Sequence, residues 1–127
     1  MRIIKATPAD VRDVKKIGIY IGVPGLGDLL FIIPLFRALK RLYPGAETIF
    51  IGKLLREYVR PVFDTCPYID GILEFHFYDS ISPGEMAGFV RRLKAEKFDI
   101  LVDTQRKIIP SLLLALGGAR WNVGYSA

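Results

Sequence analysis

The fold is decided by residues 17–30, which run Ile-Gly-Ile-Tyr-Ile-Gly-Val-Pro-Gly-Leu-Gly-Asp-Leu-Leu. The first part, Ile17–Val23, is short, apolar and β-branched, as in a central parallel strand whose two faces are both buried. The next four residues, Pro24–Gly27, form a turn-rich loop. Over Asp28–Tyr43 an apolar stripe at helical spacing runs from Leu29 to Leu42, with Lys40 among the basic residues on the other side, and Pro44-Gly45 ends this predicted helix. The stretch therefore predicts a strand, a glycine-rich loop and an amphipathic helix.

The same alternation of strand and helix continues to the end of the chain. Alternating elements with these connection lengths demand parallel strands. We therefore predict an α/β fold with a Rossmann-like, doubly wound parallel sheet, whose ligand site lies beyond the carboxyl ends of the strands. The further elements expected are strands at Thr48–Ile51, Ile72–Phe77, Phe98–Val102 and Trp121–Tyr125, and helices at Lys53–Val62, Glu85–Lys97 and Ile108–Leu116.

The length of 127 residues suits one domain, and 51% hydrophobic with 24% charged residues is a globular composition. We expect a charged N-terminal extension over residues 1–15 and one Rossmann-like domain over residues 16–127. An enzyme that closes two domains around its substrate needs roughly twice this length. The chain is therefore either a complete one-domain protein or half of a larger one.

Lys and Arg number 18 against 13 Asp and Glu, which gives a net charge of +5. This surplus can serve solubility alone, or it can attract an anionic partner such as phosphate groups, a membrane surface or nucleic acid. Nucleic acid is not expected, because the aromatic residues fall mostly on predicted core positions rather than on a stacking platform. No apolar run reaches the roughly 18 residues of a spanning helix, and the sequence leaves the oligomeric state open.

The chain has one cysteine, Cys66, and one histidine, His76. An internal disulfide and a Cys/His zinc site are therefore excluded, and we expect no bound metal. The cysteine usage and the lack of an export signal predict a reducing, cytoplasmic location.

The glycine-rich loop invites comparison with dinucleotide-binding proteins. Gly25 and Gly27 could be the first two glycines of G-x-G-x-x-G, but the third position is Leu30. The second strand also ends in Ile51-Gly52-Lys53, without the carboxylate that holds a ribose. A dinucleotide cofactor is therefore not expected, and a stand-alone Rossmann-like nucleotide-binding module remains the alternative.

Asp28, at the start of the first helix, has two candidate roles. It can cap the helix, since Asp is a preferred N-cap residue. It can also be a general base, because a loop at this edge aims it into the cleft. Pro34 lies six residues further on, where it removes a backbone hydrogen bond and is expected to distort the first turns.

Five motifs occur in order over about residues 16–126. Their residue types and spacings resemble glycosyltransferase family 9, the ADP-heptose:lipopolysaccharide heptosyltransferases and their relatives. Each motif alone is weakly specific, whereas five in the same order are fairly specific. The motifs are Gly25-Leu26-Gly27-Asp28-Leu29-Leu30; Pro34-Leu35-Phe36-Arg37-Ala38-Leu39-Lys40 with Tyr43-Pro44; Cys66-Pro67-Tyr68-Ile69-Asp70; Leu93–Gln105; and Ala119-Arg120 with Val123-Gly124-Tyr125.

The resemblance implies the two-domain GT-B fold, with this chain as the N-terminal, acceptor-binding domain and the C-terminal nucleotide-sugar domain absent. It implies an inverting transfer of a heptose-like sugar from an ADP-heptose-like donor, held mainly by the missing half, to an anionic, lipopolysaccharide-type glycolipid acceptor. The catalytic base of the family falls on Asp28. No cofactor is implied, and the chain alone is expected to be incomplete and inactive. The implied location is the cytoplasm, at the inner face of the inner membrane, where peripheral membrane contact fits a lipid-linked acceptor.

The remaining candidate residues lie at the carboxyl edge of the predicted sheet. Basic residues at spacings of three and four share a face of the second predicted helix, and others follow the fourth strand. Asp103 ends that strand, where it could equally cap the next turn. Two departures from the family pattern, Arg106 and Pro110 in place of a glycine and a basic residue, leave the acceptor's identity open. The acceptor-binding residues expected are Gly25, Gly27, Lys53, Arg56, Arg60, Asp103, Gln105 and Arg106.

Overall fold

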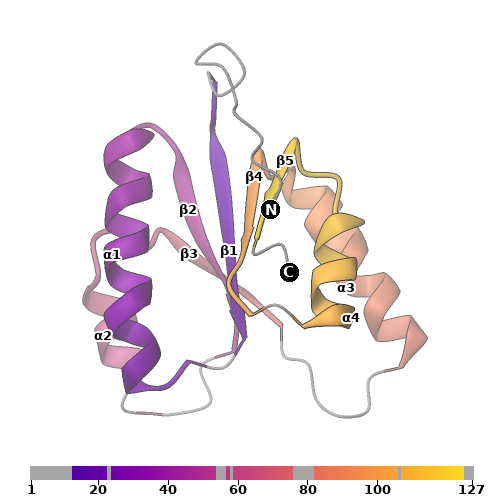
Figure 1. The fold of residues 1–127 in the computed structure, drawn as a ribbon, viewed down its shortest axis with the longest axis horizontal. Coiled ribbons are helices and arrows are strands. Elements are labelled where there is room, and N and C mark those ends of the chain that lie inside the picture. The colour runs from indigo at the N-terminus through magenta and orange to yellow at the C-terminus, as the bar shows by residue number, and fades with distance from the viewer. Residues whose placement is uncertain are drawn as a thin grey trace.

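The computed structural model describes residues 13–22, 24–53, 57, 59–75, 82–105 and 107–124. Five parallel strands form one sheet in the order β3-β2-β1-β4-β5 (Figure 1). The strands are β1 (Lys16–Gly22), β2 (Glu47–Gly52), β3 (Gly71–Glu74), β4 (Ile100–Asp103) and β5 (Trp121–Val123), and the helices are α1 (Leu26–Leu42), α2 (Arg60–Thr65), α3 (Pro83–Glu96) and α4 (Ile108–Ala115).

The helices form two layers, with α1 and α2 on one face of the sheet and α3 and α4 on the other (Figure 1). The chain builds outward from β1 to β3 and then returns to place β4 on the free side of β1. The order of the strands therefore reverses between β1 and β4, which is the switch point of a doubly wound sheet. The predicted fold class is confirmed.

Two hydrophobic clusters hold the layers together, because successive side chains of β1 point to opposite faces. Ile17, Ile19 and Ile21 belong to the cluster under α1 and α2, whereas Tyr20 belongs to the cluster under α3 and α4. Side chains around Gly18 leave no room for another, since a Cβ there would lie 2.7 Å from the Leu101 Cδ2 atom and 2.8 Å from the Ile51 Cδ1 atom. Gly18 therefore leaves the space that these neighbouring strands fill with their own side chains.

Three helices begin at residues other than those predicted, and among them α3 begins at Pro83 rather than Glu85. Helix α1 begins at Leu26 rather than Asp28, with Gly25 as its N-cap, and it continues past Pro34 to Leu42. Helix α2 spans Arg60–Thr65 instead of Lys53–Val62. The predicted range ends just after Pro61, but this proline occupies the first turn of α2, where a missing N–H is tolerated.

Other predictions fall partly outside the described residues. The extension over residues 1–15 is described only from Asp13 onward, and His76 is not described. The third strand ends at Glu74, before the predicted Phe77. Within the described residues, no helix is long and apolar enough to cross a membrane.

Candidate active site at the carboxyl edge of the sheet

Asp28 is the third residue of α1, and its carboxylate turns back to the start of the helix. The Gly25 N–H donates to the Asp28 Oδ2 atom at 2.8 Å. This satisfies one of the backbone donors that a helix start leaves open, and a negative charge is favoured at this end of the helix dipole. Asp28 is nevertheless exposed. It therefore stabilises the helix without being its N-cap residue, and its carboxylate remains accessible to a ligand.

A hollow of about 450 Å³ opens beside Asp28. It lies between α1 and the ends of β1 and β4, at the switch point of the sheet, where doubly wound folds bind their ligands. The volume is within the range of small-molecule sites, and the walls are mostly apolar, as is usual for such sites. The lining residues are Ile21, Asp28, Phe31, Ile32, Leu35, Thr104 and Gln105.

The hollow brings together Asp28 and Gln105, two residues predicted from the sequence, and adds Thr104. The Thr104 N–H and hydroxyl both donate to the Tyr20 carbonyl, at 3.2 and 2.9 Å. This pair of bonds fixes the end of β4 to β1 and so holds Gln105 at the edge of the hollow. Sequence reasoning did not select Thr104, although its place between Asp103 and Gln105 was the available signal.

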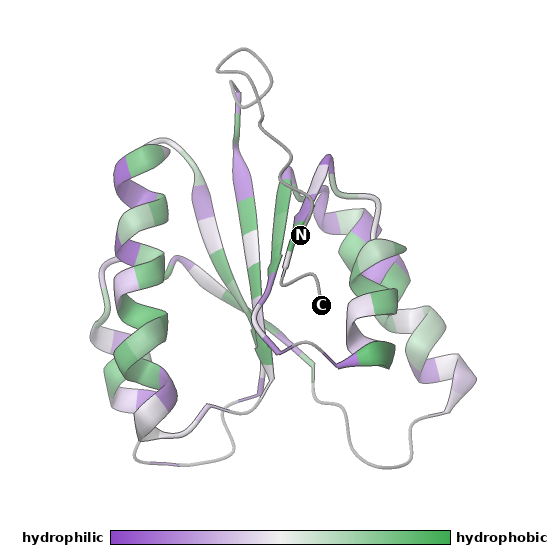
Figure 2. Ribbon diagram, in the orientation of Figure 1, coloured by the Kyte–Doolittle hydropathy of each residue, from purple (hydrophilic) through white to green (hydrophobic). Residues whose placement is uncertain are grey.

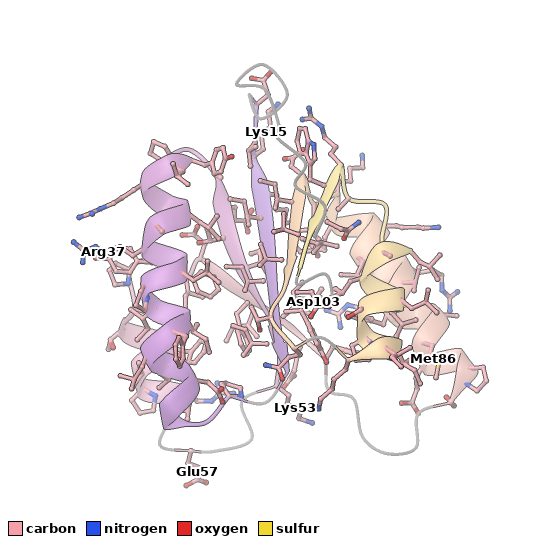
Figure 3. All side chains as sticks on the ribbon, viewed as in Figure 1. Lys15, Arg37, Lys53, Glu57, Met86 and Asp103 are labelled. Atoms are coloured by element: carbon pink, nitrogen blue, oxygen red, sulfur yellow. The ribbon has the colours of Figure 1, made fainter. Side chains whose placement is uncertain are left out.

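Asp103 lies outside this hollow and serves the local backbone. Its Oδ1 atom accepts the Gln105 N–H at 3.0 Å, and its Oδ2 atom accepts the Ser111 hydroxyl. Figure 3 shows Asp103 on the α4 side of the sheet, where it lines a separate hollow of about 240 Å³. Burial and then the nearby Asp103 charge raise the pKa of Tyr20 to about 12. The contacts of Asp103 therefore favour the turn-capping role that the sequence left open.

The predicted basic face is not formed as expected. Lys53 lies outside α2 and lines a hollow of about 410 Å³ against α3, together with Glu74, Glu85 and Arg92. Arg60 is exposed at the first residue of α2, on the opposite face of the sheet. The shared helical face of Lys53 and Arg60 was therefore wrong, because the helix begins too late to include Lys53. Arg56 and Arg106 lie outside the described residues.

Gly25 and Gly27 frame the first turn of α1 beside Asp28. A Cβ at Gly27 would meet nothing within 4 Å, so the space above this turn is open to a ligand. Among the described residues, no group of three or more His, Cys, Asp or Glu side chains could hold a metal ion.

Two of the solved structures that match share this fold over most of the chain. Escherichia coli ADP-heptose lps heptosyltransferase II matches 87% of this chain with a TM-score of 0.66 and 18% identity. The glycosyl transferase family 9 structure from Veillonella parvula DSM 2008 matches 87% with a TM-score of 0.65 and 19% identity. The chain spans only 30% and 32% of these two proteins. Comparison with known sequence families and with curated proteins gives no match.

These likenesses agree with the resemblance that the sequence motifs carry. At such low identity they establish the fold, which reproduces about a third of each glycosyltransferase. The chain is therefore a Rossmann-like α/β domain with the fold of one part of a family 9 glycosyltransferase.

Proposed function

We propose that this domain is the acceptor-binding, N-terminal part of an inverting glycosyltransferase that moves a heptose-like sugar from a nucleotide sugar to an anionic, lipopolysaccharide-type glycolipid. The observation that carries the proposal is the accessible Asp28 carboxylate at the rim of the 450 Å³ hollow, on a fold shared with heptosyltransferase II. A rigid helix start and a sheet edge hold this carboxylate, as a catalytic base requires.

In this proposal Asp28 removes the proton from an acceptor hydroxyl. The acceptor oxygen then forms a bond to the anomeric carbon of the donor sugar, while the bond from that carbon to the nucleotide diphosphate breaks and the diphosphate leaves. One displacement inverts the configuration at the anomeric carbon. The Gly25 N–H bond orients the carboxylate through Oδ2, and Oδ1 is the oxygen proposed to take the proton.

The hollow supports an acceptor that carries a sugar. Gln105 can donate to and accept from sugar hydroxyls, and the apolar wall made by Phe31 and Leu35 suits the face of a sugar ring. Arg60 and the undescribed Arg56 and Arg106 are the proposed partners of the acceptor's negative charges. The donor, an ADP-heptose-like molecule, is proposed to bind mainly to a second domain, and the reaction to take place in the cytoplasm at the inner face of the inner membrane.

Acceptor binding is tested by titrating the chain with a deacylated, phosphorylated inner-core oligosaccharide of lipopolysaccharide and recording amide shifts by NMR. Shifts are expected at Asp28, Thr104 and Gln105. Asp64→Asn, an exposed change on α2, is the matched control for Asp28→Asn. The proposal predicts that only Asp28→Asn weakens binding, while the free energy of unfolding of both variants stays within about 1 kcal/mol of wild type.

A parallel titration with ADP separates the proposal from the nucleotide-binding alternative. We expect weak binding of ADP or none, because the nucleotide-binding part is not in this domain. Micromolar ADP binding without any response to the oligosaccharide would overturn the proposal and favour a stand-alone nucleotide-binding module. Where the protein occurs together with a nucleotide-binding part, Asp28→Asn is expected to abolish sugar transfer, and retained turnover would remove Asp28 as the base.

A further inference from the structure

The side of α1 that faces away from the sheet has an unusual composition. Helix α1 has 17 residues, and none of them is Ser, Thr, Asn, Gln or Glu. At 100° per residue, its exposed residues fall on one continuous stripe, which we call the outer face of α1. Its main members are Leu30, Phe31, Pro34, Arg37, Arg41 and Leu42, all exposed.

The apolar members of this face are large and open to solvent. The side chains of Leu30, Phe31 and Leu42 are 76%, 80% and 70% exposed. Figure 2 shows α1 as predominantly hydrophobic between its ends. A surface helix normally turns charged and polar residues to water, whereas a helix that is apolar all round is covered by something. The outer face of α1 therefore has the character of a contact surface.

Apart from Asp28 in the first turn of α1, the charges on the outer face are positive. Arg37 and Arg41 are one helical turn apart and line a surface hollow of about 500 Å³ with Ile33, Pro34, Ala38 and Tyr68. Figure 3 shows Arg37 on the side of α1 away from the sheet. Within the described part of the chain, the ion pairs are Lys16–Glu96, Lys40–Asp70 and Arg120–Asp99, so neither arginine is paired with a carboxylate.

We propose that the outer face of α1 docks on an anionic phospholipid bilayer. Leu30 and Phe31 would enter the interface between headgroups and acyl chains, and Arg37 and Arg41 would bind lipid phosphates. Apolar side chains next to unpaired cations are the pattern of an interfacial helix. A protein partner would have to supply an acidic surface, whereas an anionic bilayer supplies it without any specific shape.

The position of Phe31 connects this surface with the candidate active site. Phe31 belongs to the outer face of α1 and also lines the hollow that holds Asp28. A bilayer at the outer face would therefore lie at the rim of the hollow and present its headgroups there. This delivery of a lipid-linked acceptor rests on the proposed function, but the docking itself does not.

Docking is measured by co-sedimentation of the chain with vesicles of phosphatidylcholine, with and without about 30% phosphatidylglycerol. Binding to the anionic vesicles alone is expected. Each basic residue near such a surface contributes about fivefold in affinity, so Arg37→Gln with Arg41→Gln should weaken binding about 25-fold. Leu30→Ser with Phe31→Ser should weaken it by at least about tenfold.

The matched control is Arg91→Gln with Lys94→Gln, an exposed basic pair on α3 at the opposite face of the sheet (Figure 1). It removes the same charge and should change binding by less than about threefold. Equal loss in the control, equal binding to neutral vesicles, or no binding at all would overturn the proposal. So would a dimer, seen by light scattering without lipid, that Leu30→Ser with Phe31→Ser dissociates.

The two proposals fail separately. If the chain binds anionic vesicles but not the oligosaccharide, the docking surface is supported and the acceptor site is rejected. If it binds the oligosaccharide but not the vesicles, the acceptor site is supported and the docking surface is rejected.

Discussion

Replacement of Asp70 should destabilise the fold far more than its exposure suggests. Asp70 follows the Tyr68-Ile69 segment before β3, and its Oδ2 atom accepts the Thr48 N–H at 2.8 Å, the Thr48 hydroxyl at 3.1 Å and the Lys40 ammonium. Its side chain is 35% exposed, but Thr48, near the start of β2, is fully buried. One carboxylate therefore joins α1, β2 and the approach to β3.

Two contributions to the cost can be separated. The partly exposed pair with Lys40 is worth at most about 1 kcal/mol. A buried donor left without its partner costs about 1–3 kcal/mol. Asp70→Ala removes both and should lower the free energy of unfolding by about 2–4 kcal/mol. Asp70→Asn keeps an oxygen for the Thr48 N–H and should cost only about 0.5–1.5 kcal/mol.

The pH dependence gives a second measurement. Burial raises the pKa of Asp70, but the hydrogen bonds of Lys40 and Thr48 outweigh burial and hold the pKa below its ordinary value. The unfolded chain then binds the proton more readily, so this contribution is present above the unfolded pKa of about 4 and is lost as the pH falls through the folded pKa. The stability difference between wild type and Asp70→Asn should therefore shrink with acid.

Urea unfolding of wild type, Asp70→Ala, Asp70→Asn and the exposed control Asp64→Asn, at several pH values from about 7 to 2, tests this account. The control should stay within about 0.5 kcal/mol of wild type. A cost below about 0.5 kcal/mol for Asp70→Ala, or a wild-type advantage over Asp70→Asn that grows with acid, would refute the reasoning.

Three further results are expected. Gly18→Ala should lower the free energy of unfolding by about 1–3 kcal/mol, because its Cβ would overpack the core. Gly88→Ala, which has open space around it inside α3, should raise the free energy of unfolding by about 0.5–1 kcal/mol. Equal urea midpoints for the two variants would contradict this. Tyr20→Phe, which keeps five of the six tyrosines, should give the same tyrosine absorbance titration as wild type up to about pH 11, since the pKa of Tyr20 is raised to about 12. Asp28→Asn keeps an acceptor for the Gly25 N–H and should cost under about 1 kcal/mol in thermal unfolding.

The architecture could be predicted because the hydrophobic periodicity and the Pro and Gly residues that end helices and strands agreed over most of the chain. The start of α2 could not be predicted, because Pro61 is compatible with two positions relative to a helix. A proline ends a helix that precedes it and begins a helix that follows it. The apolar residues Val59 and Phe63, which belong to the hydrophobic cluster under α1 and α2, fit either choice. The decision therefore depended on tertiary packing that a local pattern does not contain.

The site was predictable to the extent that topology decides it. Asp28 and Gln105 meet because both follow strands next to the switch point. Asp103 and Gln105 would share a face if β4 continued, since side chains alternate with a period of two. The strand instead ends at Asp103, and the bonds of Thr104 to the Tyr20 carbonyl turn the chain, so Gln105 reaches the α1 side. A strand end is the least predictable part of a pattern, and here it decides which hollow a residue enters.

The outer face of α1 shows why a correct helix prediction can still assign its faces wrongly. The inward stripe predicted by spacing ran from Leu29 to Leu42, yet Leu42 is 70% exposed and Lys40, expected outside, bonds Asp70 and the Ala46 carbonyl. In a helix with so few polar residues, hydrophobicity no longer distinguishes the core side from the outer side. The same lack of contrast that misplaced Leu42 leaves Leu30 and Phe31 in water, and it makes the vesicle experiment the direct measurement of what covers this face.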